Sequence, residues 1–187
     1  MAVVRSSDAY TTGEILHVRK LALPADILPS IPQLRDHCRI YGTHHDMMLT
    51  SYRDTAIEMV ENETGYGVGE SVWQLTASLH NRKTIELPRY PLGSGDVLCE
   101  VDGVEVGYVI DYGDSTLPVI TFDVPQTGFF EVTWQAGKPS PLALGAVRLL
   151  VGHLYEHREV STSEALRVVP VAYERLLALL SPSRGAW

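Results

Sequence analysis

The sequence has few cysteines and lacks the short motifs that mark common nucleotide-binding and hydrolase folds. Its two cysteines, Cys38 and Cys99, belong to no CxxC pair, which argues against a cysteine-based metal or redox site. A GxSxG nucleophile elbow, a phosphate-binding loop and a dinucleotide fingerprint are all absent. We therefore interpret both cysteines as reduced, partly buried thiols, and we expect no cofactor.

The sequence also has fewer basic residues than acidic ones. Lysine and arginine total 15 against 23 aspartates and glutamates, so the formal net charge is -8. A general nucleic-acid binder needs clustered cations to neutralise phosphates, and this balance argues against that class. Contact with a basic partner surface remains open.

Long apolar runs are absent as well. No stretch approaches the ~18 apolar residues of a membrane span, and the first twenty residues lack the apolar centre of a signal peptide. We expect a soluble protein that is made in the cytoplasm and has no membrane partner. The 187 residues, 45 % of them hydrophobic, suit one domain or a domain with an insertion.

Two helices are expected in the first third of the chain. Ser30 caps a short helix that ends near Ile40, and Thr43 caps a longer one that ends near residue 63, with Gly65 as C-cap. His44 and His45 fall in the first turn of the longer helix. Adjacent residues on a helix diverge by roughly 100°, so we interpret this pair as solvated and not as a metal site.

From Ser71 to Ala136 the apolar period changes from 3.6 to two. About six short strands with turn residues between them are indicated here, and Asp102-Gly103 marks a tight hairpin. Such a block predicts an antiparallel sheet, arranged as a sandwich or a small barrel.

The helical pattern resumes at Ser140, the expected cap of a helix through Glu159. Ala143, Val147, Leu150 and Leu154 share one face of it. A last helix opens at Pro170, and its apolar face comprises Val171, Leu176, Leu177 and Leu180.

These expectations give an α+β fold: a small bundle of about four helices with an inserted antiparallel β-rich subdomain that is sandwich-like or barrel-like. The boundaries are an N-terminal arm at 1–30, the first helices of the bundle at 31–70, the β insertion at 71–137, and the remaining helices of the bundle with a C-terminal tail at 138–187. The arm is interpreted as irregular, with possible short strands at 2–4 and 15–18.

The helix after Ser140 also contains His153, Glu156 and His157 in an H-x-x-E-H string, the inverted zinc-protease motif. The two histidines lie four apart on one face, and Glu156 is a possible base for metal-assisted hydrolysis. A catalytic zinc needs a third protein ligand, and the nearby Arg158 disfavours a bound cation. We therefore favour a histidine pair at the polar edge of a core helix, without metal, and keep a small zinc hydrolase as the alternative.

Five strings of the sequence form an ordered set: residues 34–40 (LRDHCRI), 60–65 (VENETG), 85–91 (IELPRYP, after Trp73), 130–137 (FEVTWQAG) and 146–159 (AVRLLVGHLYEHRE). In this order and spacing they resemble the head–tail connector (adaptor) proteins of long-tailed bacteriophages and gene transfer agents. With the last helix, the resemblance covers about residues 31–184. It also accounts for the H-x-x-E-H string as a helix pattern without metal.

The resemblance implies a non-enzymatic structural protein of the virion. Such adaptors form a ring of about twelve copies beneath the portal, extend the DNA channel and join the head to the tail. The implied partners are the portal protein, neighbouring adaptor subunits, and the next tail component, a stopper or tail terminator. Genomic DNA would pass through the channel without sequence-specific binding, which suits an acidic protein.

The interface residues that this reading indicates lie in two places. Leu180, Arg184 and Trp187, in the last helix and the tail, are expected to face the portal. Arg89, Tyr90 and Leu92 are expected to face a neighbouring subunit or the tail. A third possibility for the protein is a β-domain binding module that needs no ring.

Overall fold

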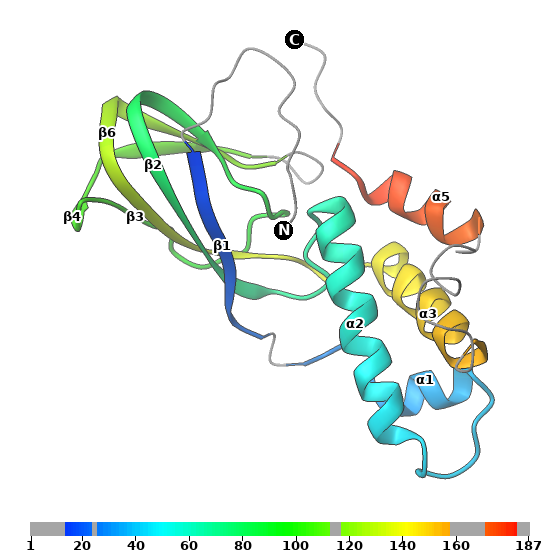
Figure 1. The fold of residues 1–187 in the computed structure, drawn as a ribbon. Coiled ribbons are helices and arrows are strands. Elements are labelled where there is room, and N and C mark those ends of the chain that lie inside the picture. Colours follow the sequence, from blue (N-terminus) through cyan, green and yellow to red (C-terminus); the bar gives the residue numbers. More distant parts are fainter. Residues whose placement is uncertain (1–13, 24–25, 113–116, 158–170, 183–187) are drawn as a thin grey trace.

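The computed structural model of the protein describes residues 14–23, 26–112, 117–157 and 171–182. In these residues the chain forms a group of four helices on one side and one six-stranded antiparallel sheet on the other (Figure 1). Each half has its own apolar core. The predicted α+β class, with a β-rich insertion inside a helical bundle, is confirmed.

Two long strands, β2 (Ser71–Glu86) and β6 (Val119–Ala136), form the centre of the sheet and pair along most of their length. The pairing shifts register between Leu79 and Arg82 and again between Arg82 and Thr84. An irregularity of this kind bends a strand without ending it. Strands β2 and β6 are therefore each longer than the short strands that the sequence indicated.

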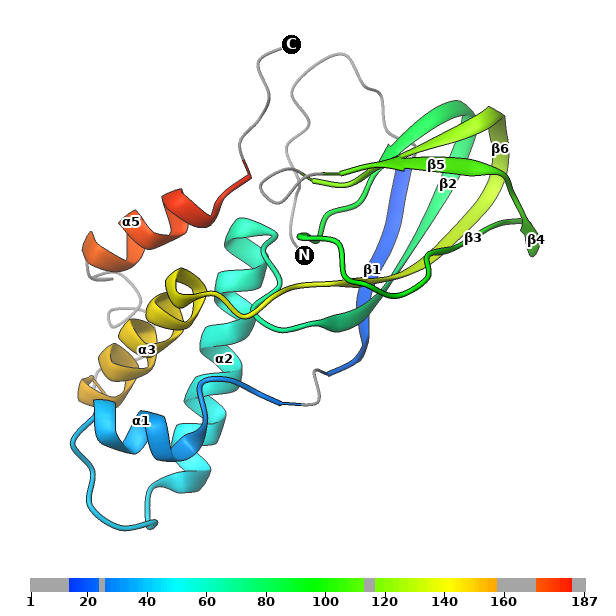
Figure 2. The same cartoon turned by 180° about the vertical axis from the view of Figure 1, so that it is seen from behind.

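Four shorter strands complete the sheet (Figure 2). Strand β1 (Glu14–Ala22) pairs with β2, and β3 (Leu98–Val101) pairs with β6 and with β4 (Val104–Glu105). Strand β5 (Tyr108–Asp111) pairs with the first half of β6. The strand order β1-β2-β6-β3-β4 describes one open sheet with two edges, so it favours neither the sandwich nor the barrel arrangement.

One face of the sheet carries its own core because apolar residues alternate along both long strands. The largest side chains of this core that are fully or almost fully buried are Trp134, Phe122, Phe130, Leu75, Leu79 and Ile85. The rings of Phe122 and Phe130 meet edge to face with centroids 5.4 Å apart.

The predicted hairpin at Asp102-Gly103 joins β3 to β4. Both residues have positive φ, 51° and 77°, as a type I′ turn requires. The Asp102 carboxylate also accepts a hydrogen bond from the backbone N–H of Phe129 at 2.9 Å. This contact fixes the hairpin against β6.

The N-terminal region is more regular than the sequence indicated. The possible strand at 15–18 is present but extends over Glu14–Ala22, and it belongs to the sheet as an edge strand. The local sequence gave little evidence of this because the pairing partner, β2, lies more than fifty residues away. The possible strand at 2–4 lies outside the described residues.

The four helices are α1 (Ile31–His37), α2 (Asp46–Thr64), α3 (Pro141–Glu156) and α5 (Val171–Leu180). The hydroxyls of Ser30 and Ser140 cap α1 and α3 as predicted, and Gly65 ends α2 in the left-handed conformation. The predicted cap of α2 is wrong. Its N-cap is His45 and not Thr43, and no side-chain cap is made there.

Helix α1 ends at His37, three residues earlier than expected. The cause is Arg39, whose φ of 54° lies outside the helical region. The helical core between α1, α2, α3 and α5 contains Leu34, Leu49, Ala56, Val60, Ala143, Ala146, Val147, Leu150, Val151, Tyr173, Leu177 and Leu180.

The predicted apolar face of α5 is partly wrong. Leu177 and Leu180 are buried and Leu176 packs on the core, but Val171 is 78 % exposed, and Tyr173 occupies the core instead. None of the helices in the described stretches of the chain is long and apolar enough to cross a membrane.

Candidate functional site

The two histidines of the H-x-x-E-H string lie on one face of α3, as their spacing predicted. Their ring centroids are 4.3 Å apart, with His153 buried and His157 exposed at the end of the helix. The Nδ1 atom of His157 lies 2.9 Å from the carbonyl oxygen of His153, so this ring packs over the last turn of the helix. Glu156 is exposed beside them.

No third metal ligand joins this pair within the described residues. Among these residues no group of three histidine, cysteine, aspartate or glutamate side chains lies close enough to hold a metal ion. Glu174 is among the described residues, whereas Glu159 and Glu164 lie outside them. The nearby Cys38 thiol has a raised pKa, first because it is buried and second because of the negative charge of Glu156, and a protonated thiol is a poor ligand.

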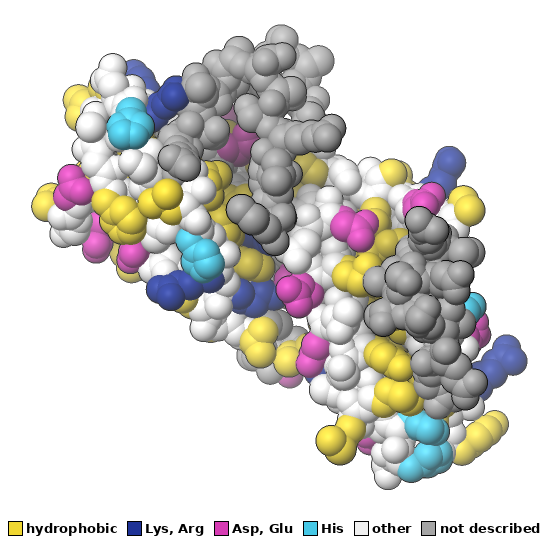
Figure 3. All heavy atoms as spheres, in the orientation of Figure 1, with side chains coloured by type: hydrophobic (Ala, Val, Ile, Leu, Met, Phe, Trp, Pro, Cys, Tyr) yellow, Lys and Arg dark blue, Asp and Glu magenta, His cyan; other side chains and the backbone are white. Residues whose placement is uncertain are grey.

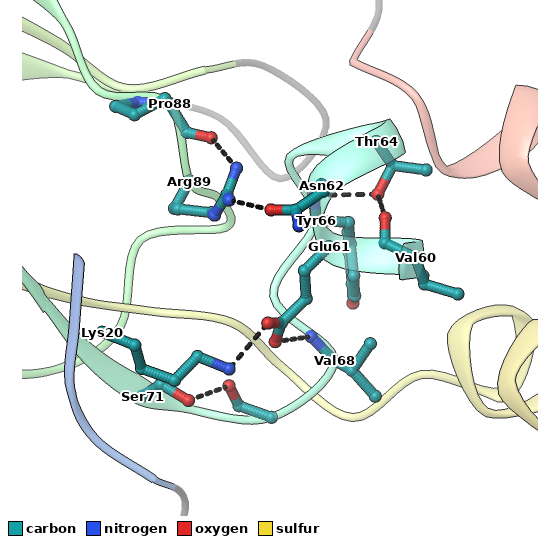
Figure 4. A network of polar contacts seen from close by, with 11 residues as sticks. Lys20, Val60, Glu61, Asn62, Thr64, Tyr66, Val68, Ser71, Pro88 and Arg89 are labelled. Carbon is teal, nitrogen blue, oxygen red and sulfur yellow. Dashed lines mark hydrogen bonds and ion pairs between the residues drawn. The ribbon is translucent and has the colours of Figure 1, made fainter. Parts of the chain in front are cut away.

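The densest group of polar contacts lies instead where the helices meet the sheet (Figure 4). We call this region the junction: Lys20 of β1, Glu61 and Asn62 of α2, Trp73 of β2, Arg89 and Tyr90 of the following loop, and residues 66–68. The residues come from four separate stretches of the chain.

Glu61 is the central residue of the junction. Its carboxylate is almost fully buried, lies 2.6 Å from the ammonium of Lys20, and accepts a hydrogen bond from the backbone N–H of Val68 at 3.2 Å. A carboxylate in the last turn of a helix is unfavourable because the helix dipole is negative there. Lys20 supplies the compensating charge from the sheet, so α2 is linked electrostatically to β1.

Arg89 makes a second link between the helices and the sheet. Its guanidinium donates a hydrogen bond to the side-chain oxygen of Asn62 at 2.8 Å and stacks over Trp73, 4.7 Å from the ring centroid. The ammonium of Lys20 lies 4.8 Å from the same ring. Burial lowers the pKa of Arg89, and the nearby Glu61 carboxylate opposes that shift. Two cations therefore hold one tryptophan of the sheet.

Tyr90 connects the loop after β2 to the helices. It is 1 % exposed, its ring meets Tyr66 edge to face at 5.5 Å, and its hydroxyl donates to the carbonyl oxygen of Leu180 at the end of α5. Burial, and then the neighbouring Tyr66, raises the pKa of Tyr90 to about 12. The phenol therefore stays protonated and keeps its donor at neutral pH.

Backbone hydrogen bonds join the chain segments that cross the junction. The N–H of Gly67 donates to the backbone carbonyl oxygen of Tyr90 at 2.8 Å, and the N–H of Lys138 donates to the carbonyl oxygen of Gly67 at 3.0 Å. The N–H of Gly137 donates to Pro91 at 2.8 Å. A methyl group on Gly67 would lie 2.5 Å from the Cα of Gly137, so this approach requires glycine.

A cleft of about 490 Å³ opens beside the junction, between β1 and α2. Its walls are apolar at Val18, Leu23 and Ile57 and acidic at Asp54 and Glu58. Among the described residues that line it, no nucleophile is paired with a base.

Of the six residues expected at interfaces, Arg89 and Tyr90 lie in the junction. Tyr90 and Leu180 are buried within the chain, Arg89 and Leu92 are half-buried, and Leu92 packs on the core of the sheet. Arg184 and Trp187 lie outside the described residues. Sequence reasoning missed Lys20 and Glu61, and took the charges at 58, 61 and 63 together as a solvated face. Only Glu61 among them is buried, which its position one turn before Gly65 did not reveal.

No protein-family model matches the chain, and no curated protein matches its sequence. Solved structures do match its fold. A chain in the neck of an empty gene transfer agent (GTA) particle, computed with C6 symmetry, has a TM-score of 0.72 and 23 % identity. A chain of the native GTA virion has a TM-score of 0.71 and 22 % identity. A chain in the neck of the native GTA particle, computed with C12 symmetry, has a TM-score of 0.69 and 20 % identity. Each match covers 91 % of this chain and 97 % of the other, which establishes the fold.

Proposed function

We propose that the protein is a structural component of the neck of a phage-like particle, the head–tail adaptor. One observation carries the proposal: the fold of nearly the whole chain matches nearly the whole of chains found in GTA necks. Order and spacing of the strings at 34–40, 60–65, 85–91, 130–137 and 146–159 support it independently. The role is assembly, and no catalysis is assigned to the chain.

In the proposed assembly, copies of the chain form a ring beneath the portal and join it to the next tail component. We propose about twelve copies, by analogy with the neck that was computed with C12 symmetry. The net charge of -8 suits a ring through which DNA passes, because a negative wall does not retain phosphates. The protein acts at the head–tail interface of the virion after synthesis in the host.

Two contacts with partners are proposed. The first is a contact of Arg184 and Trp187 with the portal, and it is supported by the hydrogen bond from Tyr90 to Leu180, which anchors the end of the helix that precedes them in the sequence. The loop from Pro88 to Gly95 emerges beside it and faces a neighbouring subunit or the tail. The buried Tyr90 positions this loop, and the half-buried Arg89 and Leu92 are its proposed contact residues.

Electron microscopy of the purified full-length protein, alone and mixed with a candidate portal ring, tests the proposal. Native mass spectrometry of the same samples counts the subunits. Rings, or a cap of copies stacked on the portal, are the expected result. A protein that stays monomeric, does not bind the portal and contains stoichiometric zinc would overturn the proposal and favour hydrolysis at His153, Glu156 and His157.

A further inference from the structure

The charges of the sheet are divided between its two sides. Residues 90–137, which include β3, β4, β5 and β6, contain eight acidic residues and no lysine, arginine or histidine. The cations of the sheet region lie on β1 and β2 or directly after β2. Lys20 and Arg89 are used at the junction, whereas Arg19 and Lys83 are exposed. Strands β1 and β2 contain four lysines and arginines against two glutamates, Glu14 and Glu86, so a weakly basic side stands opposite a strongly acidic one.

Among the strands that the structure describes, the two sides coincide with the two edges of the sheet. Within the described residues β1 pairs only with β2, and this pairing begins at Glu14 and Ser78. Beyond Ser78, the remainder of β2 pairs only with β6. We call this edge, with Arg19 and Lys83, the basic border. On the other side β4 pairs only with β3, and β5 only with β6. We call β3 to β5 the acidic border.

Two glutamates of the acidic border lie in direct cross-strand register with a third on the adjacent strand β6. Glu131 lies opposite Glu100, and Glu100 lies opposite Glu105. Like charges directly opposite one another in a sheet are destabilising. On the other side of Glu131 the same cross-strand row continues with Thr76 and then His17. Among the described residues, no lysine or arginine therefore lies in this row. The fold tolerates this repulsion, and a cation from outside the chain would relieve it.

Both borders also expose apolar side chains. Leu16, Leu21 and Leu23 are 52 %, 46 % and 67 % exposed at the basic border. At the acidic border Leu98, Val104 and Val109 are 59 %, 66 % and 65 % exposed. Figure 3 shows basic and acidic side chains, with apolar ones beside them, at separate places on the sheet half of this face. Exposed apolar groups beside complementary charges are typical of a protein interface.

We propose that the basic border of one copy docks on the acidic border of the next copy of this chain. Arg19 and Lys83 of one copy then face Glu100 and Glu105 of its neighbour, and the exposed leucines and valines pack between them. The borders lie at opposite ends of the strand order, so the contact is head-to-tail and leaves one border at each end of every pair open for further copies. Contacts of this kind generate rings. The inference rests on the proposed ring and identifies its subunit interface.

Two charge-reversed variants of the full-length protein test the pairing. The first combines Arg19→Glu with Lys83→Glu, and the second combines Glu100→Lys with Glu105→Lys. A matched control, Asp36→Lys with Glu58→Lys, reverses two exposed acids on the helices. Thermal unfolding of each variant establishes that it is folded, and assembly is followed by native mass spectrometry and electron microscopy under the conditions in which the unmodified protein forms rings.

Each border variant alone should need a protein concentration about tenfold or more above normal for half-maximal assembly, and the control should assemble normally. An equimolar mixture of the two border variants should recover assembly. In the mixture every reversed border meets a partner of opposite charge, so the copies alternate in a 1:1 ratio, which only a head-to-tail contact allows.

The other outcomes separate this inference from the proposed function. Border variants that form rings as readily as the unmodified protein would overturn the inference and leave the adaptor proposal intact; the border charges would then serve only to prevent aggregation of the sheet edges. Border variants that fail alone and also in the mixture would exclude the pairing of these two borders. If the unmodified protein forms no ring, alone or on a portal, the adaptor proposal itself fails.

Discussion

Replacement of Glu61 by alanine should destabilise the protein far more than any exposed glutamate of α2 would. The change leaves the buried N–H of Val68 without its acceptor, which costs about 1–3 kcal/mol. It also removes the partner of Lys20. That side chain is 22 % exposed, so water partly replaces the lost ion pair, and we assign it about 1 kcal/mol.

Two effects of the same change act in the opposite direction. Alanine is the better helix former by a few tenths of a kcal/mol, and loss of a carboxylate from the last turn relieves about 0.5 kcal/mol of repulsion with the helix dipole. The net expected loss is about 1–3 kcal/mol. Glu61→Gln should lose only about 1 kcal/mol, because the amide oxygen can still accept from Val68.

Urea unfolding, followed by circular dichroism, measures these differences. With a slope of about 2 kcal/mol per molar urea, Glu61→Ala should lower the midpoint by about 0.5–1.5 M. Glu58→Ala, on the exposed face one turn earlier, is the matched control and should change stability by less than about 0.5 kcal/mol. Equal effects of the two alanine variants would refute the assignment of Glu61 as the central residue of the junction.

Three further predictions concern the two cores and the crossing segments. Because burial holds the pKa of Tyr90 at about 12, above its ordinary value, the unfolded chain loses that proton first, and stability should fall as pH rises from about 10 to 12. Tyr90→Phe should lose about 1 kcal/mol at neutral pH, through its bond to Leu180, and show a flatter alkaline decline in urea midpoints. Burial raises the pKa of Cys99 to about 12, so its thiol should react slowly with iodoacetamide. In a variant without Cys38, Cys99 should resist labelling at a pH of about 8 until urea unfolds the protein. Rapid labelling of the folded form would contradict its burial. Gly67→Ala should destabilise by about 3 kcal/mol, because its methyl group meets the backbone of Gly137, and an unchanged thermal midpoint would exclude that close approach.

Local chemistry allowed much of the fold to be predicted. The hydroxyls of Ser30 and Ser140, the left-handed Gly65 and the Asp102-Gly103 turn depend on nearest neighbours in sequence, and all four occur as expected. Strand β1 depends on pairing with distant residues, so its sequence indicated only a fragment of it.

The site was harder to predict because its residues derive their roles from tertiary contacts. Glu61 resembles Glu58 in sequence, and only the approach of Lys20 from β1 makes it a buried link. Conversely, His153 and His157 have the spacing of a metal pair, but a metal site also requires a third ligand that spacing on one helix does not supply. Tyr90 was predicted at an interface with another subunit and forms one within the chain, between the sheet and α5.

The backbone hydrogen bonds around Gly67 determine how the molecule carries mechanical load. Segments before β2, after β2 and after β6 lie side by side and are bonded to one another at 2.8–3.0 Å, so a force applied to the sheet is shared by several parallel backbone links. The load is therefore not concentrated on one flexible linker. The sheet and the helices should therefore move as one rigid body. A displacement of the hairpin between β3 and β4 should displace α2 and α3 as well, without bending between the two halves.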